Sequence, residues 1–151
     1  MVGATEIDFQ FWVLQPRVGF CHFTKGISSL KQVTGHEHRD VQHYIVGVIA
    51  GAVTKDFLIA IRASMDFWYL CQAKEIDDKG CDRIRAALDE FHEHKSAIVN
   101  ADARVGKGNK PIKNWYIPKL EMMQSVISNI QANGAVIQYS ADVTEHAHIT
   151  T

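Results

Sequence analysis

The sequence predicts a mainly α-helical protein, an irregular four-helix bundle that follows a short N-terminal strand or extended segment. Apolar residues recur at spacings of three and four over most of residues 35–134, and side chains suited to helix capping precede several of these stretches. An alternating pattern is confined to the first 35 residues. With 151 residues, 46% of them hydrophobic and 22% charged, the chain has the length and composition of one folded domain.

Residues 1–34 are expected to form an extended, strand-containing lead-in to the helices. Ile7, Phe9 and Phe11 alternate with polar residues, and a period of two is typical of a β-strand. A lone strand that exposes these aromatic rings together with Trp12 would aggregate unless it packed against the helices or a partner. The lead-in is therefore also a candidate site of self-association.

Four helices are expected within residues 35–134. The first, at residues 35–53, begins at Thr34-Gly-His-Glu37, which has the S/T-x-x-E form of a capping box. The third has a narrow apolar stripe and is expected to be the most exposed of the four. The three later helices are expected at residues 55–73, 80–100 and 118–133.

A flexible basic loop is expected at residues 101–114. The net charge of −1 excludes a strongly basic nucleic-acid binder for the chain as a whole, but residues 102–113 hold four bases and one acid, a local charge of +3. Bases contact phosphates and aromatic rings stack on nucleotide bases, so this loop is the candidate DNA-contacting segment, with an ordinary solvated loop as the alternative. The candidate DNA-binding residues are Arg104, Lys107, Lys110, Lys113 and Trp115.

The remaining features of the chain predict a location in the nucleus or cytoplasm. Cys21, Cys71 and Cys81 are odd in number and form no C-x-x-C pair, which fits a reducing compartment. No apolar stretch approaches the length of about 18 residues that a membrane span requires, so no membrane contact is expected. Residues 135–151 are expected to be an extended polar tail.

The eight histidines raise the question of a metal site. Six of them occur as His-x-His pairs, and residues two apart on a helix point in nearly opposite directions, so such a pair cannot hold one ion. No metal site is therefore expected. The alternative is a small metal-binding helical bundle or metal-dependent enzyme that uses Glu90, His94 and a third group such as His43 or His146.

Four segments taken together resemble the large transposon-encoded proteins of mushroom-type fungi, the Plavaka-like relatives of the CACTA-type DDE transposases. The C-terminal part of the chain is similar to an uncharacterised domain at the tail of such proteins. The likeness extends over nearly the whole chain. The segments are residues 30–42 (LKQVTGHEHRDVQ), 57–63 (FLIAIRA), 115–121 (WYIPKLE) and 140–149 (SADVTEHAHI).

The resemblance implies a catalytically incomplete piece of such a transposase. In that family three acidic residues of a ribonuclease-H-like domain bind two divalent metal ions, and Glu37 is the residue here that resembles the last of the three. The first two would lie before Met1, so we expect no enzyme activity and no cofactor, with Mg²⁺ bound only in an intact parent protein. DNA or other transposase segments are the implied partners. A self-associating structural module is a further alternative.

Overall fold

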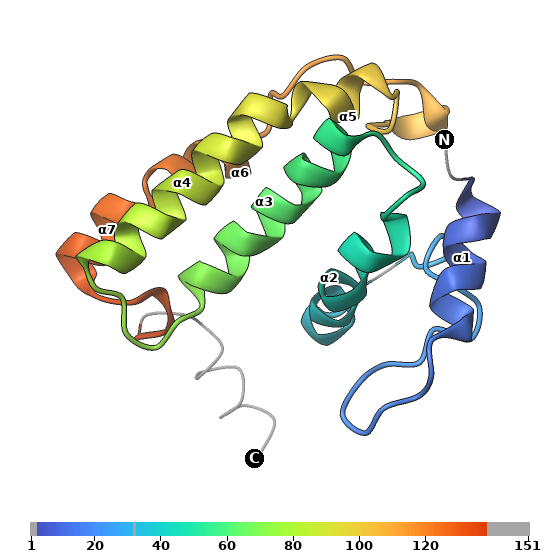
Figure 1. Ribbon diagram of the computed structural model, residues 1–151, viewed down its shortest axis with the longest axis horizontal. Coiled ribbons are helices and arrows are strands. Elements are labelled where there is room, and N and C mark those ends of the chain that lie inside the picture. Colours follow the sequence, from blue (N-terminus) through green and yellow to red (C-terminus); the bar gives the residue numbers. More distant parts are fainter. Residues whose placement is uncertain (1–2, 32, 139–151) are drawn as a thin grey trace.

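The computed structural model describes residues 3–31 and 33–138 and confirms the mainly helical class (Figure 1). Short 3-10 turns at Lys107–Asn109 and Val136–Gln138 add to the helices. Within these ranges the only strand-like pairing is an isolated antiparallel bridge between Val105 and Pro111. The α-helices are α1 (Ala4–Val13), α2 (Gly35–Ile49), α3 (Lys55–Cys71), α4 (Asp78–His94), α5 (Ser96–Asn100), α6 (Pro118–Gln124) and α7 (Val126–Asn133).

The predicted N-terminal strand is wrong, because Ala4–Val13 forms helix α1. Ile7 and Phe11 are four residues apart, a spacing that satisfies an alternating pattern and one face of a helix equally well. Phe11 is fully buried and meets the ring of Phe23 edge to face, with the ring centroids 5.7 Å apart. A β-strand would have placed Phe9 on the same face as Phe11, but Phe9 is 50% exposed. The contact between Phe11 and Phe23 therefore favours the helix over the strand.

The start of α2 agrees with the sequence, whereas its end does not. Thr34 and Glu37 form the predicted capping box, in which each side chain binds the backbone nitrogen of the other residue. The helix ends at Ile49 instead of residue 53, because Gly51 adopts a φ of +80°, which a helix cannot accommodate. Thr54 then caps α3 by accepting a hydrogen bond from the amide of Phe57.

Two helices that were predicted to be continuous are interrupted. The third expected helix divides into α4 and α5 at Lys95. There the amide of Ile98 donates to the carbonyl of Lys95, three residues back, which is the tighter 3-10 pattern and not the α-helical one. The fourth divides into α6 and α7 at Ser125, whose hydroxyl donates to the carbonyl of Met122 at 2.9 Å. Such back-bonding competes with the helical hydrogen bonds and bends the helix.

The core lies between α3 and α4, which form the most extensive helix pair of the described residues. The prediction that the third helix is the most exposed is wrong: α4 packs against α3 and α7 (Figure 1), and it buries one face between residues 81 and 91. That face consists of Cys81, Ile84, Ala87, Leu88 and Phe91.

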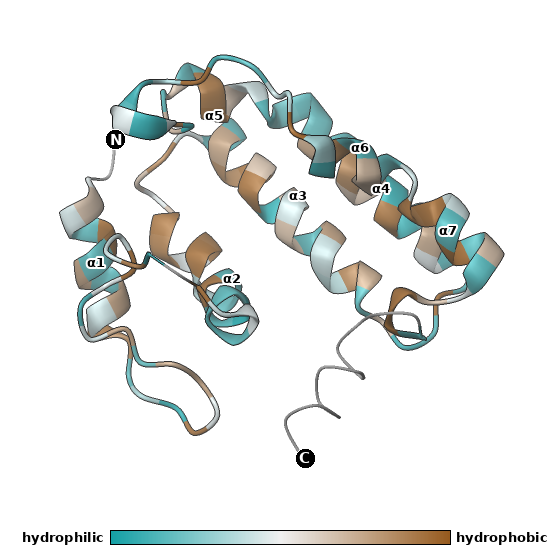
Figure 2. Cartoon of the chain, turned by 180° about the vertical axis from the view of Figure 1, so that it is seen from behind, coloured by the Kyte–Doolittle hydropathy of each residue, from teal (hydrophilic) through white to brown (hydrophobic). Residues whose placement is uncertain are grey.

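The N-terminal part of the chain packs on α2. Helix α1 contacts α2, and the loop between them returns along both helices. Figure 2 shows that α2 changes from hydrophilic at its start to hydrophobic near its end, where it approaches α3. None of the described helices is long and apolar enough to cross a membrane. Most of the expected polar tail falls on residues 139–151, which lie outside the described residues.

Candidate functional site

The predicted basic loop forms a short hairpin, which we call the basic hairpin (residues 104–113). The amide of Gly106 donates to the carbonyl of Lys110 at 2.9 Å, and the amide of Ile112 donates to the carbonyl of Arg104 at 2.8 Å. The chain reverses through Gly108 and Asn109, whose φ angles of +74° and +56° lie in the left-handed region that glycine and asparagine adopt most readily. The segment is therefore held by backbone hydrogen bonds at its base.

The four bases of the basic hairpin occupy two different environments. Lys107, Lys110 and Lys113 are exposed, and none of them takes part in an ion pair within the described part of the chain. Arg104 is half-buried, and its guanidinium carbon lies 5.4 Å from the centre of the Trp115 ring. The three lysines face solvent, whereas Arg104 packs on Trp115 at the base of the hairpin.

Trp115, predicted as a stacking residue, lies partly within the protein. Its ring meets Phe91 of α4 nearly edge to face, with centroids 5.7 Å apart, and its buried Nε1 has no hydrogen-bond partner among the residues that the structure describes. Tyr116, the next residue, is 89% exposed. Trp115 thus connects the basic hairpin to the core, and Tyr116 has the ring that is open to solvent.

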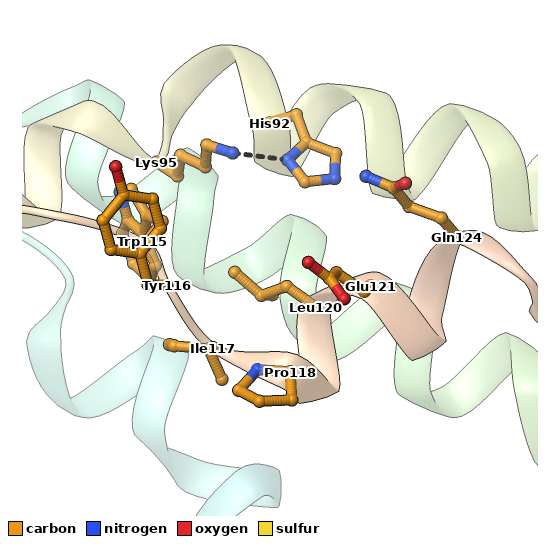
Figure 3. Close-up of a pocket in the computed structure, with 9 residues that line it drawn as sticks. All are labelled: His92, Lys95, Trp115, Tyr116, Ile117, Pro118, Leu120, Glu121 and Gln124. Carbon is orange, nitrogen blue, oxygen red and sulfur yellow. Dashed lines mark hydrogen bonds between the residues drawn. The ribbon is translucent and has the colours of Figure 1, made fainter.

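A cavity of about 290 Å³ adjoins Trp115 (Figure 3). In it, the amine of Lys95 lies 2.8 Å from Nδ1 of His92. Burial, reinforced by the charge of Lys95, lowers the pKa of His92 below its ordinary value. His92 is therefore neutral at pH 7 and accepts this hydrogen bond. Across the cavity from His92 lie Leu120 and Glu121 at the start of α6.

Glu37 serves as the capping residue of α2. Its carboxylate accepts hydrogen bonds from the backbone nitrogen of Thr34 at 2.8 Å and from the hydroxyl of Thr34 at 2.9 Å. These bonds, the backbone bond above all, lower the pKa of Glu37. In residues 3–31 and 33–138, Glu37 belongs to no group of three candidate metal ligands. Its correspondence to a catalytic acid stays a prediction.

The structure gives the residues of the alternative metal site separate partners. Glu90 binds Arg62 at 2.7 Å. Nδ1 of His94 lies 3.2 Å from the carboxylate of Asp56, and the alternative third group, His43, lies 3.0 Å from the hydroxyl of Tyr69. The other alternative, His146, lies outside the described residues.

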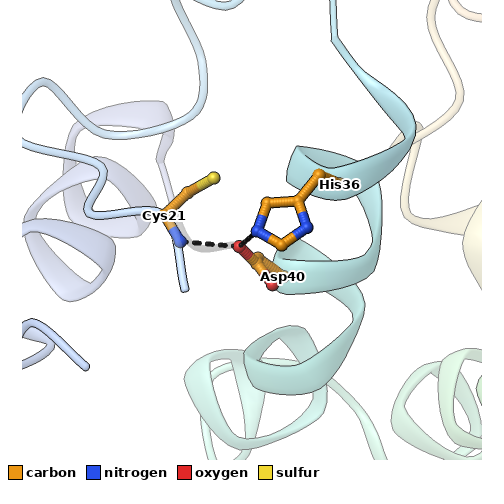
Figure 4. A group of neighbouring side chains, drawn as sticks. All are labelled: Cys21, His36 and Asp40. Carbon is orange, nitrogen blue, oxygen red and sulfur yellow. Dashed lines mark hydrogen bonds and ion pairs between the residues drawn. The ribbon is translucent and has the colours of Figure 1, made fainter. Parts of the chain in front are cut away.

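A cluster that the sequence analysis did not identify joins Cys21, His36 and Asp40 (Figure 4). Asp40 is 3% exposed and is the one buried charged side chain in the part of the chain that the structure describes. Its carboxylate accepts a hydrogen bond from the backbone amide of Cys21 at 2.6 Å and lies 3.5 Å from Nε2 of His36. The i,i+4 spacing of His36 and Asp40 was the available sequence signal.

The electrostatics of this cluster follow from burial and charge. Burial, followed by interaction with the Asp40 carboxylate, raises the pKa of the Cys21 thiol. Burial also acts to raise the pKa of Asp40, but the hydrogen bonds from Cys21 and the nearby charges of His36 and His43 outweigh it. The net result is a lowered pKa, so Asp40 is ionised at neutral pH.

The comparisons with known proteins give no assignment. No family model matches the chain, and neither does any curated protein or solved structure.

Proposed function

We propose that the chain is a non-catalytic, DNA-contacting helical segment of a transposase-like protein, and that the basic hairpin is its phosphate-contacting surface. The observation that carries the proposal is the outward exposure of Lys107, Lys110 and Lys113 on one backbone-bonded hairpin, without an ion-pair partner among the described residues. The resemblance of residues 30–42 and 115–121 to the transposase family supports DNA as the partner.

Counterion release supplies the energy of such a contact. Each phosphate that a lysine neutralises frees condensed counterions, so binding weakens as salt is added. Three exposed lysines predict weak, sequence-independent binding, with a contribution of about −3 to the slope of log K against log salt concentration. Arg104 supports the surface from beneath through its contact with Trp115. The basic hairpin is therefore suited to positioning a duplex and not to reading its sequence.

The test is titration of the full chain with a fluorescent DNA duplex over a salt series. The triple variant Lys107→Ala, Lys110→Ala, Lys113→Ala is expected to lose most of the affinity and most of the salt slope. The matched control removes three exposed lysines elsewhere, Lys25, Lys74 and Lys79, and lowers the net charge by the same amount. Equal losses in both variants, or no binding by the wild-type chain at low salt, would refute the proposal.

Self-association through α1 is a second candidate function, because the outer side of this helix is apolar. Phe9, Trp12 and Val13 are 50%, 53% and 46% exposed, and the rings of Phe9 and Trp12 lie 5.8 Å apart. We propose that a second copy of the chain covers this surface. Light scattering should then show a dimer that the variant Phe9→Ser, Trp12→Ser converts to a monomer, whereas a monomeric wild-type chain would exclude it.

A further inference from the structure

Three side chains of different metal-binding chemistry converge where the loop after α1 meets the start of α2. The ligand atoms of Cys21, His36 and Asp40 all lie within 4.8 Å of one another. Figure 4 shows the Asp40 carboxylate between the backbone of Cys21 and the imidazole of His36. His36 and Asp40 come from successive turns of one helix, while Cys21 comes from a loop nineteen residues before Asp40.

The spacing of two of the three ligand atoms matches that of a tetrahedral metal centre. Zinc binds sulfur at about 2.3 Å and nitrogen or oxygen at about 2.0–2.2 Å, which places neighbouring ligand atoms about 3.3–3.7 Å apart. The 3.5 Å between Nε2 of His36 and Oδ2 of Asp40 already falls in this range. The thiol of Cys21 lies within 4.8 Å of both of these atoms, so it must move inward to complete three ligands.

The donor set also matches zinc in charge and in chemical type. A thiolate, a neutral imidazole and a carboxylate carry two negative charges together, which balance one divalent ion. Hard cations such as Mg²⁺ and Ca²⁺ prefer all-oxygen sites, whereas zinc accepts sulfur, nitrogen and oxygen together. The buried carboxylate of Asp40 gains a charge partner from such an ion, since His36 alone neutralises it only when protonated.

We propose that Cys21, His36 and Asp40 form a zinc site that fastens the loop after α1 to α2. A cavity of about 210 Å³, lined by Cys21 and Glu37 among others, adjoins the cluster. Solvent from this cavity supplies the fourth ligand. The site is independent of the basic hairpin, which lies on a different part of the chain.

The surrounding structure holds the loop in position for the metal. Asp8 of α1 accepts hydrogen bonds from the amides of Ile27 and Ser28, each at 2.8 Å. Phe23, two residues after Cys21, packs on the buried ring of Phe11. The capping box at Thr34 fixes the first turn of α2, which carries His36. Cys21 and His36 are thus positioned from two sides before any ion binds.

The test is metal binding by the purified full chain. After dialysis against Zn²⁺ and removal of unbound ion, elemental analysis should give one zinc per chain. Co²⁺ in place of Zn²⁺ should produce a sulfur-to-cobalt charge-transfer band and the intense visible bands of tetrahedral cobalt. Zinc absent at saturation, or cobalt bound without the sulfur band, would overturn the proposal.

Matched variants assign the ligands. Cys21→Ala and His36→Gln should each abolish the tetrahedral cobalt spectrum, and Asp40→Asn should weaken Zn²⁺ binding by at least about tenfold. The controls Cys81→Ala and His38→Gln change the same residue types outside the cluster and should bind one zinc. Far-UV circular dichroism verifies the fold of each variant, and His36, which is exposed, provides the variant least able to disturb it. Equal loss in the controls would contradict the assignment, and no outcome depends on DNA binding.

Discussion

The carboxylate of Asp8, in the middle of α1, accepts a hydrogen bond from the backbone amide of Ile27 at 2.8 Å. Ser28 adds a second bond through its amide and a third through its hydroxyl. Gly26 completes the arrangement: it has a φ of +72°, and a Cβ at this position would collide with the side chain of Asp8. One carboxylate therefore connects α1 to a loop about twenty residues later.

We predict that acid weakens this connection. The hydrogen bond from the Ser28 hydroxyl, followed by those from the backbone, lowers the pKa of Asp8 below its ordinary value. A carboxyl group with a lowered pKa in the folded state stabilises the fold above its unfolded pKa, and this contribution is lost as the pH falls through the lowered value. Amide hydrogen exchange at Ile27 and Ser28 should therefore accelerate, relative to its intrinsic rate, below about pH 4.

The variant Asp8→Asn should show this faster exchange already at pH 7 and little further change on acidification. Glu75→Gln removes the same charge from an exposed loop and serves as the control. Unchanged protection of Ile27 in Asp8→Asn would contradict the role of the carboxylate.

Replacement of Phe67 should cause a large loss of stability. This residue of α3 is fully buried in the core between α3 and α4. Removing a buried aromatic ring costs about 3–5 kcal/mol, so Phe67→Ala should lower the free energy of unfolding by that amount in urea denaturation. Trp68→Ala, which truncates the neighbouring residue at 41% exposure, is the control and should cost much less. Equal losses of unfolding free energy in the two variants would contradict the placement of the core between α3 and α4.

The capping box of α2 offers a test in which only a small loss of stability is expected. Thr34→Ala removes the side chain that accepts from the amide of Glu37, and loss of such a cap costs about 0.5–2 kcal/mol. Thr34→Ser keeps the acceptor and should keep nearly all of the stability. If thermal unfolding shows equal midpoints for the Ala and Ser variants, the cap does not contribute to the stability of α2.

The contribution of Tyr116 to DNA binding can be tested separately from that of the lysines of the basic hairpin. Because Tyr116 is 89% exposed, its ring is available to unpaired bases, and Tyr116→Ala should weaken binding of single-stranded DNA by about 1–3 kcal/mol. Duplex binding should change little, since paired bases do not expose their faces. Tyr116→Phe retains the ring and should bind normally. Equal effects on both DNA forms would exclude stacking.

The features that sequence analysis predicted are those determined by nearby residues. The Thr34–Glu37 box and the helix expected at residues 55–73 depend on contacts within a few residues, and both appear in the structure. Helix α1 was missed because Ile7 and Phe11 fit either period, and the deciding contact with Phe23 comes from a distant part of the chain.

The same distinction applies to the candidate sites. The basic hairpin was visible as a run of bases with glycines, but the half-burial of Trp115 depends on Phe91, which lies in a different helix. The Cys21 cluster is not apparent in the sequence, because the i,i+4 pair of His36 and Asp40 supplies only two ligands and Cys21 lies nineteen residues before Asp40. Only the return of the loop along α2 brings Cys21 to them.

The two cysteines at the α3–α4 turn have a practical consequence. Cys71 ends α3 and Cys81 lies in the first turn of α4, and both are buried. Burial raises the pKa of Cys71 to about 11, which leaves almost no reactive thiolate at neutral pH. Alkylating reagents should therefore modify these two thiols only when this end of the helix pair opens. The rate of labelling, followed by mass spectrometry, therefore reports how often this end of the helix pair opens.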